Sequence, residues 1–376
     1  MKFETLAIHS GRKVDTATGA VTPAIHLSTT FERDAGGGYS RGFDYSRSDN
    51  PNRRQVEQCI AALEGGRSAH AFASGSAASL AVFSLLRPGQ RVLSSSDCYH
   101  GTARQLREIV AGWGIDVEFV DTTDEMRFRD ALEASPTALV WIETPSNPTL
   151  KLSDIEGLAV HAHRAGALVC CDNTFATPVL QRPLELGADL VMHSSTKYFG
   201  GHSDLTSGVV VVGDDPQLES RLRSYQSVSG AVPSPFDCWL LARSLATLPY
   251  RVRAQVESAG RLAQAFASHP RVEHVFYPGL ADHPHHALAR RQMPGGCGAI
   301  VSILVEGTAT DALAVASRTR LFTQATSLGG IESLIEHRAS IEGPGTRTPQ
   351  NLLRLSVGLE HPDDLIADLT AALDRD

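Results

Sequence analysis

The residue of this chain best suited to chemistry is Lys197, which stands among small hydroxyl residues directly after the short apolar run 190–192. Such a run predicts the end of a buried strand, and open α/β sheets bind ligands beyond the carboxyl ends of their strands. Ser194 and Thr196 beside it carry hydroxyls that can hydrogen-bond a phosphate. A lysine in such a site can form a Schiff base with a carbonyl, as enzymes do to hold pyridoxal phosphate. Taken alone, the pattern also fits a solvated lysine at a strand end.

Two further strand exits carry side chains that suit the same cofactor. Asp172 directly follows the apolar run 167–171, and a carboxylate that is partly buried there needs a partner. A pyridinium nitrogen would be such a partner, while a helix N-cap or backbone N–H groups would be the structural alternative. Tyr99 stands between a predicted strand, 91–94, and a predicted helix, 102–112. Its ring could lie against a planar cofactor or anchor its loop to the core.

An anion site is predicted at two other places in the chain. In Ser74-Gly75-Ser76, between a short strand and a helix, the backbone N–H groups of Gly75 and Ser76 are free to bind an anion, although many such turns bind nothing. Arg354 interrupts the apolar strand 352–357. A buried arginine demands an anion, and either a substrate carboxylate or a structural salt bridge would satisfy it.

Composition excludes several classes of protein. The 376 residues are 42% hydrophobic and 20% charged, typical of a globular protein, and the net charge of −8 without a basic stripe argues against a nucleic-acid partner. The six cysteines have no metal-ligand spacing, so we expect no metal site and a reducing, cytoplasmic location. No apolar run is long enough to span a membrane, so no membrane association is expected.

The order of strands and helices predicts an α/β protein in three parts. Residues 1–50 lack long periodic segments and are predicted to form an arm that lies on a neighbouring subunit. Residues 51–248 alternate short apolar strands with helices, which predicts a large, mostly parallel sheet domain. The order of helices and strands in residues 249–376 predicts a smaller α+β domain.

Together these motifs strongly resemble the Cys/Met-metabolism (trans-sulfuration) family of pyridoxal-phosphate enzymes. The matching segments cover nearly the whole chain in the family's order: Tyr-Ser-Arg-Ser-x-Asn-Pro (45–51), Ser-Gly-Ser (74–76), Asp-Cys-Tyr-x-Gly (97–101), Glu-Thr-Pro-Ser-Asn-Pro (143–148), Asp-Asn-Thr-Phe (172–175), His-Ser-Ser-Thr-Lys-Tyr-x-x-Gly-His-Ser-Asp (193–204), Ser-Leu-Gly-Gly-x-Glu-Ser (327–333) and Arg-Leu-Ser-Val-Gly-x-Glu (354–360). The resemblance implies a fold-type I, aspartate aminotransferase-like architecture with pyridoxal 5'-phosphate as cofactor.

The resemblance also implies a role for each matching residue near the cofactor. Lys197 matches the lysine that binds the cofactor and moves protons, Asp172 the partner of the ring nitrogen, and Tyr99 the ring stacked on the cofactor, which can also exchange a proton. The residues that match the family's phosphate cradle are Gly75, Ser76, Ser194 and Thr196.

Two further groups of residues match positions that involve a second subunit or the substrate. Tyr45 and Arg47 match phosphate contacts that come from the neighbouring subunit, which implies a dimer, usually paired into a homotetramer. Arg354, helped by Ser327, matches the clamp on the substrate carboxylate, and Asn147 matches the side chain near that carboxylate and the cofactor hydroxyl.

Within the family we predict a cystathionine γ-lyase-type carbon–sulfur lyase, which releases a thiol, ammonia and a 2-oxo acid from a sulfur amino acid. Cystathionine γ-synthase and cystathionine β-lyase are the alternatives. Thr326 stands where γ-lyases and γ-synthases often have glutamate, which counts against cystathionine as the best substrate. Gly101 stands where methionine γ-lyases usually have cysteine, which counts against that activity, whereas residues 230–237 are more similar to the lyases.

Two other classes of protein are less consistent with the sequence. A non-enzymatic scaffold descended from this family should have lost Lys197, Asp172 or Arg354, and all three are present. An NAD enzyme of the Rossmann class should open a strand into GxGxxG with an acidic residue about 20 positions later, and no strand here does so.

Overall fold

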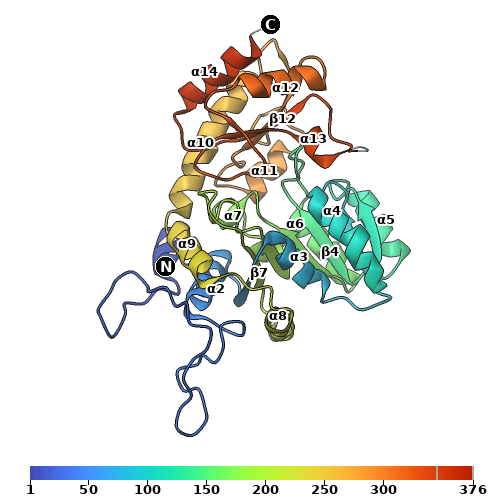
Figure 1. Ribbon diagram of the computed structural model, residues 1–376. Helices are drawn as coiled ribbons and strands as arrows, with labels where there is room; N and C mark the ends of the chain where they lie inside the picture. The colour runs from blue at the N-terminus through green and yellow to red at the C-terminus, as the bar shows by residue number, and fades with distance from the viewer. Residues whose placement is uncertain (344–345, 375–376) are drawn as a thin grey trace.

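The computed structural model describes residues 1–343 and 346–374, which form two β-sheets with helices packed on them (Figure 1). The last two residues of the predicted C-terminal domain, 249–376, lie outside the described residues. The larger sheet has the strand order β1-β7-β6-β5-β4-β2-β3. Its strands are β1 Ser68–Phe72, β2 Arg91–Ser95, β3 Asp116–Val120, β4 Leu139–Glu143, β5 Leu168–Asp172, β6 Leu190–His193 and β7 Gly208–Val212.

The larger sheet is mixed but mostly parallel, as predicted. Strands β3, β2, β4, β5 and β6 run parallel to one another, while β7 pairs antiparallel with both β6 and β1. Strands β2, β4 and β7 are buried along their whole length, as expected for near-continuous apolar runs covered by helices on both faces. The parallel arrangement brings the carboxyl ends of β4, β5 and β6 to one edge.

Helices follow most of these strands, and polar residues fix where several of the helices begin. The helices of this part of the chain are α2 Pro51–Glu64, α3 Gly75–Phe83, α4 His100–Gln105, α5 Glu125–Ala134, α6 Ile155–Arg164, α7 Thr177–Leu180, α8 Pro216–Ser229 and α9 Pro235–Leu245. Asn50, Ser74, Asp124 and Ser234 each accept a hydrogen bond from a backbone N–H of the helix that follows. Such N-caps satisfy donors that the first turn leaves open.

The smaller sheet has the strand order β10-β11-β12-β9-β8 and is covered by the C-terminal helices. The elements are α10 Leu248–Phe266, β8 Val272–Phe276, α11 His286–Gln292, β9 Ile300–Val305, α12 Ala309–Arg318, β10 Thr323–Gln324, β11 Leu334–His337, α13 Arg338–Glu342, β12 Leu352–Ser356 and α14 Pro362–Leu373. The long helix α10 connects the region of the larger sheet to that of the smaller (Figure 1). One apolar cluster includes Val56, Leu241, Val252, Ile303 and Leu369, so both regions share a core.

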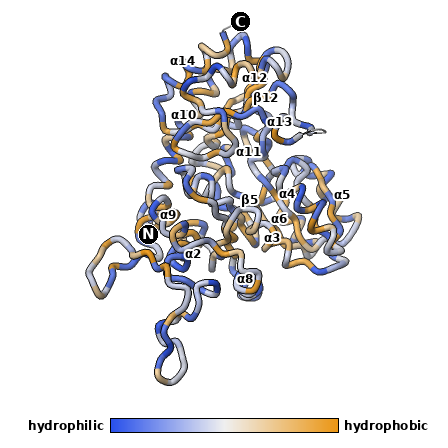
Figure 2. The backbone as a smooth tube through the Cα atoms, in the orientation of Figure 1, coloured by the Kyte–Doolittle hydropathy of each residue, from blue (hydrophilic) through white to orange (hydrophobic). Residues whose placement is uncertain are grey.

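The N-terminal segment begins with a short helix, α1 Phe3–His9, which packs against α2 and α10. Beyond it the chain runs as loops that extend away from the sheets at the lower left of Figure 1. Val14, Val21 and Leu27 in these loops are exposed. The loop farthest from the sheets is mostly hydrophilic (Figure 2).

The strands predicted at 91–94, 167–171 and 190–192 differ from β2, β5 and β6 by at most one residue at either end, but one predicted helix differs from the structure. The predicted helix 102–112 is α-helical only to Gln105 and continues as a π-helical turn, Leu106–Val110, and a 3₁₀ turn, Ala111–Trp113. Helix α9 ends at Leu245, and α10 begins at Leu248. Pro249 lies in the first turn of α10, where its missing N–H costs no helical hydrogen bond.

Candidate active site

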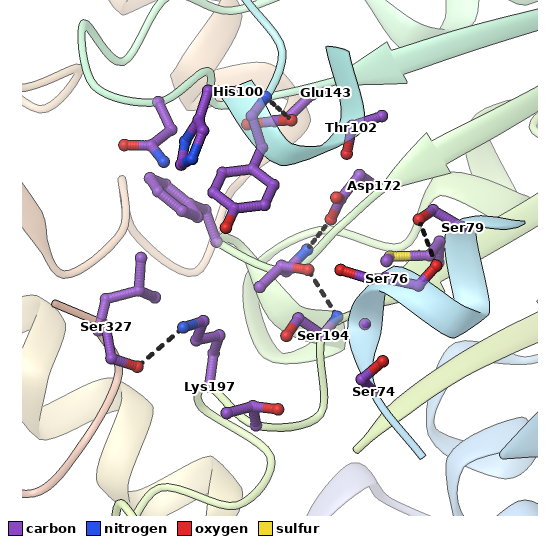
Figure 3. Close-up of a pocket in the computed structure, with 18 of the residues that line it drawn as sticks. Ser74, Ser76, Ser79, His100, Thr102, Glu143, Asp172, Ser194, Lys197 and Ser327 are labelled. Atoms are coloured by element: carbon purple, nitrogen blue, oxygen red, sulfur yellow. Dashed lines mark hydrogen bonds between the residues drawn. The ribbon is translucent and has the colours of Figure 1, made fainter. Parts of the chain in front are cut away.

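A pocket of about 250 Å³ lies at the carboxyl edge of the larger sheet and is closed on its other side by residues of the smaller one. Its lining includes the exits of β4, β5 and β6, the start of α3, and residues from segment 326–328, α13 and β12. Figure 3 shows Lys197, Asp172, Ser194 and Ser76 around one hollow. The structure therefore brings together the strand exits that the sequence singled out.

Lys197 is held inside this pocket rather than in solvent. It lies four residues after the end of β6, and its Nζ donates a hydrogen bond to Ser327 Oγ at 2.8 Å (Figure 3). Burial, and to a smaller extent the charges of Arg354 and Arg338, lower the pKa of Lys197 to about 8. At neutral pH this amine loses its proton far more readily than an ordinary lysine does.

Asp172 is the last residue of β5 and is buried. It does not cap a helix, because the next helix begins only at Thr177. One of its oxygens, Oδ1, accepts from the backbone N–H of Thr174 at 3.0 Å. Burial raises the pKa of Asp172 above its usual range, although the hydrogen bonds from Thr174 act in the opposite direction. A cation placed against this carboxyl group would offset the free energy that is needed to bury its negative charge.

Glu143 is a site residue that the sequence reasoning did not assign. It ends β4 in register with Asp172 on β5, and its Oε2 accepts from the backbone N–H of Tyr99 at 2.6 Å (Figure 3). Burial, followed by the nearby negative charge of Asp172, raises the pKa of Glu143 well above its usual range. Glu143 thereby fixes the loop that carries Tyr99. Its position directly after an apolar strand is the same signal that identified Asp172.

The Tyr99 side chain lines the pocket and is 41% exposed. The edge of its ring meets His100, with 4.6 Å between the ring centroids. A Cβ atom added at Gly101 would lie 2.3 Å from the Tyr99 ring. The small residue at position 101 therefore leaves room for this orientation of Tyr99.

The start of α3 forms a cradle next to the exit of β6. Ser74 caps the helix by accepting from Ala77 N–H at 3.1 Å, which leaves the N–H groups of Gly75 and Ser76 at the pocket. A Cβ atom at Gly75 would lie 2.8 Å from Ser194 Oγ, so glycine permits this close approach. Thr196, the other predicted cradle residue, also lines the pocket and exchanges hydrogen bonds with Ser207.

Arg354 lies on β12 and forms a structural salt bridge, one of the two alternatives left open by the sequence. It forms an ion pair with Glu336 on the neighbouring strand at 2.6 Å, and it also lines the pocket. Its Nη1 donates to Asn147 Oδ1 at 3.0 Å, and its Nη2 donates to the backbone oxygen of Ser327 at 2.8 Å. Burial lowers the pKa of Arg354 to about 10, a value at which it remains charged near neutral pH.

Tyr45 and Arg47 are the two predicted cofactor contacts that the structure does not bring to this pocket. Neither residue is among those that line it. Tyr45 lies in the N-terminal loops and is exposed, with the guanidinium of Arg47 5.7 Å from the centre of its ring. Arg47 donates a hydrogen bond to the backbone oxygen of Ser227.

Comparisons with known proteins show which family the chain matches. The model of the family described as Cys/Met metabolism PLP-dependent enzyme matches residues 4–374. The chain is 43% identical to the cystathionine β-lyase of Coxiella burnetii, over 99% of this chain and 97% of that protein. It is 44% identical to the cystathionine γ-synthase of Mycobacterium bovis, over 98% of this chain and 96% of that protein. The crystal structure of the cystathionine γ-lyase CalE6 from Micromonospora echinospora, 42% identical, superposes with a TM-score of 0.95 and covers 100% of both chains.

The chain belongs to the Cys/Met metabolism family of PLP-dependent enzymes. It is an enzyme that acts on small amino acid substrates, and its cofactor is pyridoxal 5'-phosphate. The residues present fit that cofactor, because the pocket holds a lysine with a lowered pKa, a buried carboxyl group and a cradle that only glycine permits. The relatives are named for different activities at similar identity, and a second structure of CalE6, 43% identical, is described as a methionine γ-lyase, so the family alone does not select one. Among the helices that the structure describes, none has the length and apolarity to cross a membrane.

Proposed function

We propose that the chain is a carbon–sulfur lyase of the cystathionine γ-lyase type, which releases a thiol, ammonia and a 2-oxo acid from a sulfur amino acid. The observation that carries this proposal is the position of Lys197, which donates to Ser327 while Ser327 also accepts from Arg354. An elimination needs a base next to the substrate Cα, and a guanidinium fork can fix the carboxylate on that same carbon. The similarity of residues 230–237 to the lyases also supports it.

The cofactor would be held by residues from several strand exits. In this proposal the N–H groups of Gly75 and Ser76 and the hydroxyls of Ser194 and Thr196 bind its phosphate, and the carboxylate of Asp172 pairs with its ring nitrogen. When bound, pyridoxal phosphate supplies a positively charged ring that accepts the electron pair released at the substrate Cα.

Other side chains of the pocket would bind the substrate and transfer its protons. Arg354 and Asn147 hold the substrate carboxylate, so the Cα–H bond points towards Lys197. The neutral amine of Lys197 removes the Cα proton and, for a leaving group on Cγ, a second proton from Cβ. Tyr99 exchanges a proton with the departing sulfur or with the incoming amine, and Glu143 keeps its loop in place.

A second copy of the chain would complete the site. Tyr45 and Arg47 lie outside their own pocket, on a segment that extends from the sheets, and we propose that they contact the phosphate bound by a neighbouring subunit. The assembly would be a homodimer, paired into a tetramer. Mixing a Lys197→Ala chain with an Arg47→Ala chain tests this, because each mixed dimer regains one intact site and therefore activity. We also propose a cytoplasmic location, since all six cysteines are free and buried.

The products formed from candidate substrates test the proposed reaction. The purified enzyme is given L-cystathionine, L-cysteine or L-homocysteine, and 2-oxobutanoate and pyruvate are measured, with Lys197→Ala as the control. Release of 2-oxobutanoate supports the γ-lyase, whereas pyruvate from cystathionine would identify a β-lyase. If neither keto acid forms but an acyl-homoserine condenses with cysteine, the lyase proposal is wrong and the enzyme is a γ-synthase.

A further inference from the structure

A second buried arginine, Arg338, lies beside Arg354. It is the first residue of α13, directly after β11, and is 1% exposed while still lining the pocket. Its Nη1 donates to Glu336 Oε2 at 2.8 Å. The same oxygen of Glu336 is 2.6 Å from Arg354 Nη2. One carboxylate oxygen is therefore shared by two guanidinium groups.

This sharing affects how Arg354 can bind a ligand. Glu336 is buried, and its other oxygen has no hydrogen-bond partner among the described residues. A buried carboxylate with one cationic partner would bind that partner strongly and would compete with any substrate carboxylate for it. Because Arg338 and Arg354 both contact the same oxygen of Glu336, Glu336 binds Arg354 less strongly than it would bind a single cationic partner.

Arg338 is held in place independently of Arg354. Its Nη2 donates to Glu342 Oε1 at 3.0 Å and lies 3.5 Å from His100 Nδ1. Glu342 in turn accepts from the hydroxyls of Thr346 and Thr348. Because these contacts hold Arg338 through Nη2, the terminal nitrogen that does not bind Glu336, its position does not depend on what Arg354 binds.

We propose that Arg338 is a positioning residue that holds Glu336 and thereby leaves Arg354 able to bind the substrate α-carboxylate. This inference depends on the proposed role of Arg354. When the substrate carboxylate binds Arg354, Glu336 keeps Arg338 as its cationic partner and is not left buried as an unpaired charge. Arg338 therefore affects the binding of the substrate more than the chemical step.

The test compares the holoenzyme with the variants Arg338→Leu, Glu336→Gln and the double variant. For each we measure KM, kcat and the dissociation constant of propanoate, a carboxylate without an amine, by ligand-observed NMR. In Arg338→Leu, the KM and the propanoate dissociation constant should rise roughly tenfold while kcat changes less than about twofold, because Glu336 then binds Arg354 alone. In the double variant, where the competing charge is also absent, both constants should return to about those of Glu336→Gln.

A purely structural role would give a different pattern. In that case the double variant would be at least as impaired as Arg338→Leu, and the proposal would be refuted, as it would be if Arg338→Leu left both constants unchanged. If Arg338→Leu does not fold, Arg338→Lys replaces it and should show a smaller change in the same direction. Arg91→Leu is the matched control, because Arg91 is a buried arginine paired with Glu118 outside the pocket.

A separate variant, Arg354→Leu, shows whether the proposed role of Arg354 or only the inference on Arg338 is wrong. If Arg354→Leu leaves the KM and the propanoate dissociation constant unchanged, Arg354 is not the carboxylate clamp. The proposed role of Arg354 and the inference on Arg338 would then both be wrong. If Arg354→Leu raises both constants and Arg338→Leu does not, only the inference is wrong.

Discussion

Replacing Arg354 by leucine should raise the pKa of Lys197, and this change can be measured on the amine itself. In the wild-type chain burial is the main reason that this pKa is about 8 instead of the usual 10.5, and Arg354 is the next contributor. At pH 7 a pKa of 8 leaves about 9% of the amine neutral, against about 0.03% for an ordinary lysine, a difference of roughly 300-fold. Loss of the neighbouring positive charge should shift the pKa upwards by on the order of one unit.

Competitive labelling of the cofactor-free protein with acetic anhydride measures this pKa. The chain contains four lysines, Lys2, Lys13, Lys151 and Lys197, and the first three are exposed. They serve as references in the same sample when the labelled peptides are separated and quantified between pH 6 and 11. The labelling of Lys197 should rise with a midpoint near pH 8 in the wild type and at higher pH in Arg354→Leu.

The outcome that would refute this reasoning is a wild-type midpoint near pH 10.5, which would mean that burial of Lys197 does not disfavour its charged form. An unchanged midpoint in Arg354→Leu would show that the two groups do not interact. The lowered pKa of Lys197 also determines how the stability of the folded chain changes with pH. Because the folded chain releases this proton at lower pH than the unfolded chain does, Lys197 makes stability increase as pH rises from about 8 to 10.5.

Three further predictions concern the cofactor and its surroundings. Asp172→Asn should keep the fold but lower kcat by about 100-fold or more, because a neutral amide cannot pair with a charged ring nitrogen; steady-state kinetics and the visible spectrum check this. Gly75→Ala should weaken cofactor binding by roughly tenfold or more in a spectroscopic titration, because the new Cβ would lie 2.8 Å from Ser194 Oγ, and an unchanged affinity would contradict the cradle. Gly101→Cys should displace the Tyr99 ring, whose nearest atom would be 2.3 Å from the new Cβ, and so change the visible spectrum; an unaltered spectrum would count against ring stacking.

The sequence predicted the larger sheet well because its strands are short apolar runs with polar residues directly after them. Lys197 and Asp172 stand out for this reason, because Lys197 follows β6 and Asp172 ends β5, and the two parallel strands end at the same edge. The same logic applied to Glu143 would have identified it as well. In the smaller sheet the strand of only two residues, β10, and the short antiparallel strand β11 were not predicted, because they have too few residues to show a period.

Contacts between residues far apart in the chain could not be predicted from local patterns. The sequence indicates that Arg354 needs an anion, but it does not choose between a salt bridge and a ligand. The structure pairs Arg354 with Glu336 and places it at the pocket. The partner of Arg338 depends on a helix, α13, that begins within the site and was not predicted. Charge compensation of this kind is set by the packing of β11 against β12, not by sequence spacing.

The arginine that we propose binds the substrate and the arginine that we propose positions it both affect the base that would react with the substrate. Arg354 and Arg338 both contribute to the lowered pKa of Lys197, while Glu336 acts in the opposite direction. A carboxylate bound at Arg354 would offset part of that positive charge, so we expect the pKa of Lys197 to rise when such a ligand is present. The amine is therefore neutral most readily before the ligand binds and becomes the stronger base afterwards, when the Cα proton has to be removed. The proposed role of Arg338 matters here. By sharing the Glu336 oxygen that contacts Arg354, it would weaken that internal pair and leave Arg354 able to respond to a ligand carboxylate.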